Sequence, residues 1–107
     1  MRKSKINISG LKIGTAENRE GLTGVTVILA PDGGATAGVD VRGCAPGTRE
    51  TDLLDPRKTV QKIHAVVLSG GSAFGLEAAS GCVKYLAEQG VGFPIGNVCV
   101  PIVCSAV

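Results

Sequence analysis

Apolar and polar positions in the first part of the chain predict a β-hairpin. Residues 25–30 are rich in β-branched side chains, which favour a strand. In residues 35–41 apolar side chains alternate with small or polar ones, as in a half-buried strand. Between them, Pro31-Asp32-Gly33-Gly34 has the composition of a tight turn. We therefore predict a hairpin over residues 25–41, preceded by a polar segment (1–10) and a short strand (11–14).

The later segments alternate between strand-like and loop-like patterns. Residues 42–55 are rich in glycine, proline and charge, which predicts a loop. Asp55-Pro56 is typical of a helix start, so we expect a short helix that ends near Ile63. Residues 64–69 are mostly apolar, which predicts a strand buried on both faces. The pattern further predicts a loop at 92–96 and a strand at 98–107.

A helical pattern follows Gly75 and continues to Gln89. Its apolar residues form two stripes, one of Leu76, Ala79, Val83 and Leu86 and one of Phe74, Ala78, Cys82 and Tyr85. Because polar positions are scarce, we expect this helix to be buried on most sides, between two layers. Close packing against another element would explain Gly81 within it, and Gly90 is expected just beyond its end.

Length and composition exclude several classes of protein. The 107 residues fit one domain or part of one. The net charge of +2 is too small to indicate a nucleic-acid partner, although basic residues gather at 2–5 and 57–62. Only three aromatic residues and as many as 16 glycines leave little side-chain area for a core. We therefore expect residues 1–107 to need more chain or a partner to fold stably.

No segment of the sequence directs the chain to a membrane or a secretory route. The start has charges but no apolar core of a signal peptide, and the longest apolar stretch (98–107) is half of the ~20 residues that a span needs. We expect a cytoplasmic protein. The spacing of the four cysteines does not match a metal site, so we interpret them as small buried hydrophobic residues. They are Cys44, Cys82, Cys99 and Cys104.

The segment with the most chemical information is Gly70-Gly71-Ser72, between a predicted strand and a predicted helix. Glycine-rich turns at helix starts present backbone N–H groups that bind a phosphate, a carboxylate or a developing oxyanion. The residues do not complete a dinucleotide-binding fingerprint, a P-loop or a nucleophile elbow. Two interpretations stay open: a tight turn in which Ser72 caps the helix, or a backbone-lined substrate pocket.

Two other groups of polar residues are weaker candidates for a functional site. His64 has no carboxylate nearby in the sequence, so a structural or surface role is favoured over catalysis. Arg49, Glu50 and Asp52 could form a site, but charged loops are usually only solvated.

Four ordered motifs resemble the L-aminopeptidase/D-esterase (DmpA-type) family, which includes the β-peptidyl aminopeptidases and the nylon-oligomer endo-hydrolases. They are LTGVTVI (22–28), AGVDVRG (37–43), PGTRETDLL (46–54) and HAVVLSGGSAFGL (64–76). The match extends over nearly the whole chain from Ile8 onward. The resemblance implies an α/β fold, a layered α-β-β-α sandwich like that of ornithine acetyltransferase, of which residues 1–107 are the amino-terminal part of a single self-processing hydrolase domain.

The resemblance also implies a mechanism. Family precursors cut their own backbone, and the new amino-terminal Ser or Thr becomes the nucleophile of an amide or peptide hydrolase without metal or organic cofactor. That residue is expected beyond Val107, so this chain holds no catalytic residue, and Ser72 and Ser105 are not the nucleophile. Gly70, Gly71, Ser72 and Phe74 are expected to line the substrate or oxyanion pocket. The expected partners are the remaining fragments of the precursor, further copies in a homo-oligomer such as a tetramer, and a small peptide or amide substrate.

Alternative functions stay open. The same fold supports an acyltransferase, and the chain could be a non-catalytic fragment that only completes a fold or an oligomer. Within the hydrolases, an aminopeptidase must hold the substrate's ammonium with a carboxylate. Residues 101–107 contain no Asp or Glu where aminopeptidases of the family have one, so we expect cleavage of internal amides.

Overall fold

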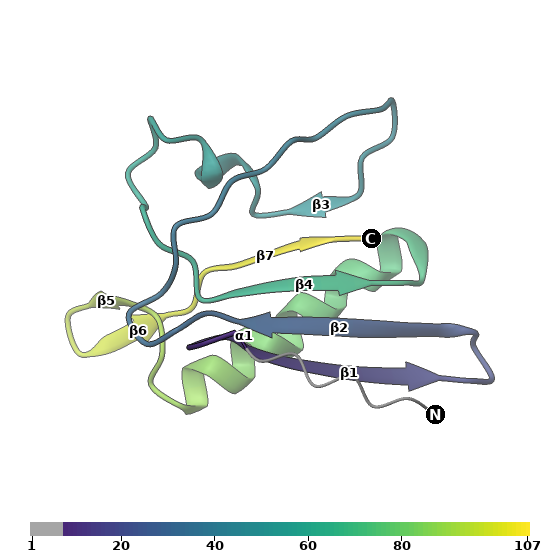
Figure 1. Ribbon diagram of the computed structural model, residues 1–107, viewed down its shortest axis with the longest axis horizontal. Coiled ribbons are helices and arrows are strands. Elements are labelled where there is room, and N and C mark those ends of the chain that lie inside the picture. The colour runs from purple at the N-terminus through teal and green to yellow at the C-terminus, as the bar shows by residue number, and fades with distance from the viewer. Residues whose placement is uncertain (1–7) are drawn as a thin grey trace.

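The computed structural model describes residues 8–107, which form a mixed α/β structure with one main sheet and one α-helix (Figure 1). The sheet has the strand order β1-β2-β4-β7-β3, and a separate two-stranded hairpin is formed by β5 and β6. The bounds of the sheet strands are β1 Lys12–Asn18, β2 Thr23–Leu29, β3 Thr48–Arg49, β4 Ala65–Ser69 and β7 Val103–Ala106. The predicted polar segment at 1–10 and the basic residues at 2–5 lie largely outside the described residues.

The predicted hairpin over residues 25–41 is wrong in its second strand. β2 is a strand as expected, but its antiparallel partners are β1 and β4, with Thr15 opposite Thr26 and Val27 opposite Val67. Residues 36–41 are irregular, and only Ala35 makes an isolated bridge, to Ile63. The Pro31 turn therefore leads away from the sheet, because β4 occupies the edge of β2 that a hairpin partner would need.

The central feature is a parallel pair, β4 and β7, connected through a helix. After β4 the chain forms a 3-10 helix, η2 (Ser72–Glu77), which continues directly into α1 (Ala78–Glu88). The chain then passes through the hairpin of β5 (Phe93–Ile95) and β6 (Val98–Val100) before it enters β7. The expected loop at 92–96 is thus part of a hairpin, and the expected strand at 98–107 is divided at Pro101.

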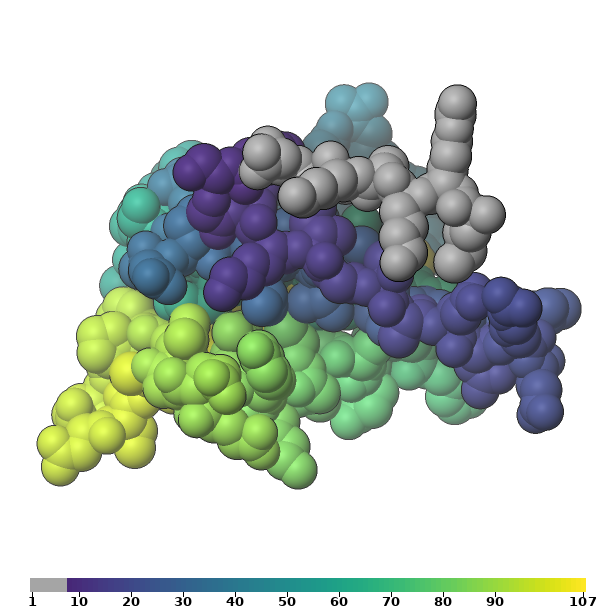
Figure 2. All heavy atoms as spheres, turned by 60° about the horizontal axis from the view of Figure 1, so that its bottom comes forward, coloured from purple at the N-terminus to yellow at the C-terminus, as the bar shows by residue number. Residues whose placement is uncertain are grey.

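One face of the sheet packs against α1. Ala79, Cys82 and Leu86 of the helix contact Val67 and Val103 of the parallel pair, and all five are buried. Figure 2 shows the helix (green) along β1 and β2 (purple to blue), with the tip of their hairpin projecting beyond it. The expected burial of the helix on most sides is wrong for the described residues, because Phe74 and Tyr85 of the second predicted apolar stripe are exposed. The expected close packing at Gly81 is also absent there, since nothing lies within 4 Å of its Cβ position.

The other face of the sheet is covered only in part. Ile63, Ile102 and Cys104 form a small buried cluster with residues of the irregular segment, among them Leu53 and Leu54. That segment holds a short 3-10 helix, η1 (Asp52–Leu54). The helix expected at 55–63 is absent. The Asp55 carboxylate does not cap a helix but accepts hydrogen bonds from the backbone and the guanidinium of Arg57. β4 is therefore buried on one face only, and Leu68 on the other face is 47% exposed.

The described residues thus confirm an α/β fold, with one main sheet and one α-helix packed on it. The second sheet and second helical layer of the expected α-β-β-α sandwich stay predictions. Within residues 8–107 no helix combines the length and the apolar character that a membrane crossing requires.

Candidate functional site

The carboxyl ends of β4 and β7 lie at the same edge of the sheet, because the two strands are parallel. β4 ends at Ser69, directly before the glycine-rich turn, and β7 ends at Ala106. The edge strand β3 adds Arg49, which is paired with Ser105 of β7. In open α/β sheets ligands bind outside the carboxyl ends of parallel strands, so this edge is the candidate site.

The turn after β4 has an unusual backbone. Gly71 has a φ of 92° and Ser72 a φ of 58°, two consecutive residues in the left-handed region that costs non-glycine residues roughly 1–2 kcal/mol. Gly71, and not Ser72, stands at the cap position of η2, and no side chain caps the helix, so the predicted role of Ser72 as a cap is wrong. The N–H of Gly70 is already used, since it donates to the Gly24 carbonyl at 2.8 Å.

The turn is held by a close approach between its two ends. The Ser69 hydroxyl donates to the Gly75 carbonyl oxygen at 2.7 Å. A Cβ atom on Gly75 would overlap the Gly70 carbonyl group, so only glycine fits there. Residues 69–75 are therefore a rigid element whose exposed backbone can bind a ligand.

A groove of about 370 Å³ lies beside this turn, between the tip of the β1–β2 hairpin and the start of the helix. Gly70 and Phe74 line it, together with Glu17 and Asn18 from the hairpin. Gly71 and Ser72 are exposed but are not among its lining residues, so the structure brings together only two of the four predicted pocket residues. Phe74 is 92% exposed, which is unusual for a phenylalanine in a folded protein.

Arg49 connects the edge strand to the helix. Its Nη1 donates to the Ser80 hydroxyl at 2.7 Å and to the Leu76 carbonyl at 3.4 Å. The sequence grouped Arg49 with Glu50 and Asp52, but the structure separates them. Glu50 is exposed, and Asp52 begins η1. Ser80 is a contact that sequence reasoning missed, because only the pairing of β3 with β7 brings Arg49 to the helix.

His64 lies at the opposite end of the parallel pair and has a structural role. It is 6% exposed, its Nδ1 accepts the Ile102 N–H at 3.1 Å, and its carbonyl accepts the Ala30 N–H. Burial lowers the pKa of this imidazole below its usual 6.5. The structure therefore agrees with the structural interpretation of this histidine.

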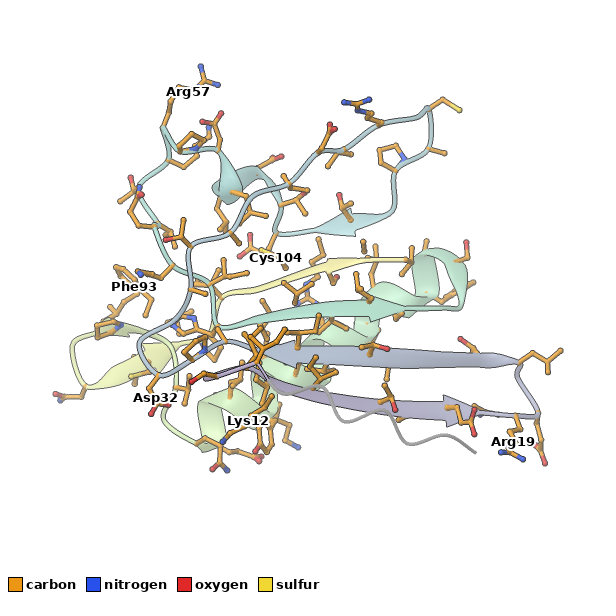
Figure 3. The ribbon with its side chains drawn as sticks, viewed as in Figure 1. Lys12, Arg19, Asp32, Arg57, Phe93 and Cys104 are labelled. Carbon is orange, nitrogen blue, oxygen red and sulfur yellow. The ribbon has the colours of Figure 1, made fainter. Side chains whose placement is uncertain are left out.

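The cysteines behave differently from one another. Cys82 and Cys104 are buried, whereas Cys44 is exposed and Cys99 is intermediate. Burial, with the Glu50 charge as a smaller contribution, raises the pKa of the Cys104 thiol to about 11, and this thiol donates to the Glu50 carbonyl oxygen. Figure 3 shows Cys104 on β7 below the irregular segment. Within residues 8–107 no three His, Cys, Asp or Glu side chains gather as metal ligands would.

Comparisons with known proteins show which proteins this chain resembles. A family model, described as peptidase family S58, matches residues 5–107. An uncharacterized aminopeptidase of Mycobacterium tuberculosis is 54% identical over 84 residues, which are 78% of this chain and 24% of that protein. A 6-aminohexanoate-oligomer endohydrolase of Paenarthrobacter ureafaciens is 39% identical over 85 residues, 79% of this chain and 21% of that protein.

The matched region spans only about a quarter of the length of these relatives. The family model covers residues 5–107 and therefore all four motifs that resemble the DmpA-type family, so that resemblance is confirmed. This chain belongs to peptidase family S58.

Proposed function

We propose that these residues are the amino-terminal part of an amide or peptide hydrolase that cleaves its own precursor. The observation that carries the proposal is the family match over residues 5–107, which includes the whole glycine-rich turn. The nucleophile is an amino-terminal Ser or Thr supplied by chain beyond residue 107. Its hydroxyl attacks the substrate carbonyl carbon, the amine leaves with a proton, and water then releases the acyl group from the enzyme.

In this proposal the edge at the carboxyl ends of β4 and β7 forms one wall of the substrate pocket. Gly71 and Ser72 have a left-handed backbone, and residues 8–107 provide no acceptor for their N–H groups, which the turn holds in a fixed orientation. Such groups stabilise the oxyanion that forms when an amide carbonyl is attacked. Phe74 supplies an apolar surface beside them, for the alkyl part of the substrate.

The open face of β4 is consistent with a second layer supplied by the rest of the protein. Leu68 and Ile13 on this face are 47% and 40% exposed, although neighbouring positions are apolar. A second sheet would bury them, as in the expected α-β-β-α sandwich, and each fully buried side chain of this size contributes about 1.5–3 kcal/mol.

The proposal is tested by the mass and amino-terminal sequence of every chain in the purified full-length protein. Self-cleavage predicts two fragments, of which the second begins with Ser or Thr, and the change of that residue to Ala leaves one uncut chain without hydrolase activity. A single intact chain that hydrolyses amides would contradict the self-processing mechanism. Intact and cut forms that are both inactive on amides would favour a structural role.

A second candidate, a strict aminopeptidase, is supported by the higher identity to relatives with that name. The absence of Asp and Glu from residues 101–107 instead favours cleavage of internal amides. The two are separated by an amide oligomer with a free amino end and the same oligomer acetylated at that end. Equal turnover indicates an internal amide hydrolase, and loss of activity on the acetylated compound indicates an aminopeptidase. An added acceptor amine that diverts the acyl group would identify an acyltransferase.

A further inference from the structure

Arg49 is a partly buried cation with no acidic partner among the described residues. The ion pairs within residues 8–107 join other arginines to acidic neighbours close in the chain, namely Arg19 to Glu17, Arg42 to Asp40 and Arg57 to Asp55. Those three arginines are at least 84% exposed, whereas Arg49 lies between β3 and α1. A guanidinium taken partly out of water without a negative charge is costly, so its position calls for a partner.

The hydrogen bonds of Arg49 leave one edge of its guanidinium available. Arginine has five N–H donors, and the contacts to Ser80 and Leu76 both come from Nη1. Residues 8–107 provide no acceptor for Nε or Nη2. The Nε–Nη2 edge presents two parallel N–H bonds, the geometry that binds both oxygens of a carboxylate.

Ser105 provides an independent sign that this place is incomplete. Its side chain is 2% exposed, and its Oγ is the buried side-chain polar atom without a hydrogen-bond partner among the described residues. Ser105 is directly opposite Arg49 in the β3–β7 ladder, so the two side chains leave the same face, with Cβ atoms about 5 Å apart. A buried hydroxyl without a partner destabilises the fold, and a ligand oxygen beside Arg49 would supply that partner.

This pair also lies at the candidate site. Leu76, whose carbonyl accepts from Arg49, belongs to η2, which begins directly after Gly71. Ser105 is in register with Val67 of β4, three residues before the glycine-rich turn begins at Gly70. Arg49 and Ser105 therefore lie at the same edge of the sheet as the backbone groups that the proposed function assigns to the oxyanion.

We propose that Arg49 and Ser105 form a carboxylate-binding site, with Arg49 holding both oxygens and the Ser105 hydroxyl donating to one of them. This deepens the proposed function, because a carboxylate at this edge fixes where an amide substrate lies. The carboxylate has two possible sources: the carboxyl end of the substrate, or an Asp or Glu from the part of the full-length protein outside residues 8–107.

The first experiment measures binding and needs no turnover, so it stands if the hydrolase proposal fails. Butyrate and butyramide, which differ in charge but hardly in shape, are titrated calorimetrically into the full-length protein. A site for the substrate's carboxyl end predicts that butyrate binds about 10- to 100-fold tighter than butyramide. Arg49→Met should abolish this difference. Arg49→Lys should only reduce it, because lysine keeps the positive charge but lacks the two-bond geometry. Arg57→Met is the matched control, since Arg57 is exposed and points away from the sheet (Figure 3).

The second experiment identifies an internal source and does not depend on a variant that folds. A crystal structure of the full-length wild-type protein shows whether an Asp or Glu oxygen lies at hydrogen-bond distance from Nε and Nη2 of Arg49. Such a residue assigns the carboxylate to the protein itself and predicts equal binding of the two probes. If no carboxylate occupies this edge and butyrate binds no better than butyramide, the proposal is wrong.

Discussion

The two ends of the parallel pair β4–β7 differ in how completely their polar groups are satisfied. At the amino end, His64 and Ile102 exchange hydrogen bonds, and the backbones of Ile63 and Ala35 each donate one hydrogen bond to the other. Ile63, His64 and Ile102 are buried, and Ala35 is half-buried. At the carboxyl end, the Ser105 hydroxyl has no partner within residues 8–107, and Gly71 and Ser72 in the turn after β4 are left-handed and exposed.

This difference indicates which end supports the fold and which end supports function. Complete hydrogen bonding and burial at the amino end stabilise the sheet and leave nothing for a ligand to bind. Strained backbone and unsatisfied polar groups persist only where the surrounding structure holds them, and they concentrate at binding sites. Changes at the amino end should therefore affect stability, and changes at the carboxyl end should affect activity.

The largest expected effect is that of Gly71→Val in the full-length enzyme. A β-branched residue at a φ of 92° displaces the backbone N–H groups of the turn, and loss of one oxyanion donor reduces turnover about 10²- to 10³-fold. The matched control is Gly33→Val, at a φ of 86° in open space far from the turn. Both variants should lose similar stability in urea unfolding, but only the first should lose turnover. Equal turnover of the two variants would remove the turn from the active site.

At the amino end, His64→Leu should reduce stability without a specific effect on turnover. Leucine leaves the buried Ile102 N–H without an acceptor, at a cost of about 1–3 kcal/mol. His64→Asn keeps an acceptor near the Nδ1 position and is expected to recover part of this loss. Urea unfolding of both variants measures the difference. A stable His64→Leu variant with impaired turnover would reverse the assigned roles of the two ends.

Phe74→Ala should have the opposite effect to His64→Leu, with impaired turnover and nearly unchanged stability. Because this ring is 92% exposed in residues 8–107, its removal should change the free energy of unfolding of this part by less than about 0.5 kcal/mol. Loss of an apolar contact of ~1.4 kcal/mol with the substrate would raise KM about tenfold. Steady-state kinetics together with thermal unfolding separate the effects. A large loss of stability with unchanged KM would show that another part of the protein covers Phe74.

The smallest expected effect is a pH dependence that belongs to the amino end. Since burial lowers the pKa of folded His64 below 6.5, the unfolded chain takes up the proton first as the pH falls. The stability that the neutral imidazole contributes is complete above pH 6.5 and is lost progressively below it, toward the lower pKa of the folded state. Urea unfolding of wild type and His64→Asn between pH 7.5 and 5.5 should show a steeper decline for wild type. Parallel curves would mean that His64 does not titrate in this range.

Local patterns predicted the elements whose sequence has a strong preference. The β-branched residues of β2 and the apolar run of β4 were recognised as strands, and the helix after Gly75 was expected. The partner of β2 was assigned wrongly because Pro31-Asp32-Gly33-Gly34 resembles a hairpin turn, while β1 contains Gly14, Ala16 and Asn18, which have weak strand preference. Strand pairing depends on contacts between distant residues, and no local pattern contains them.

The candidate site divides in the same way. The glycine-rich turn could be predicted from the sequence, because its residues are consecutive and the backbone there requires glycine. Gly71 has a positive φ, and Gly75 approaches the Gly70 carbonyl group closely. The placement of Arg49 against Ser80 and Ser105 could not, since it depends on the pairing of a two-residue strand with the last strand of the chain. The cap role of Ser72 failed because Ser72 is already the first residue of η2, Gly71 occupies the cap position with a left-handed backbone, and no side chain there accepts a helix N–H.

The central claim, that the carboxyl end of β4–β7 is the functional edge, is tested most directly by where a substrate-like molecule binds. We would determine a crystal structure of the full-length protein, with its nucleophile changed to Ala, in complex with a short amide oligomer. The claim predicts that the scissile amide lies against the backbone of Gly70, Gly71 and Ser72, with Phe74 beside its alkyl chain. An oligomer bound instead at the amino end, near His64 and Ile102, would contradict the claim.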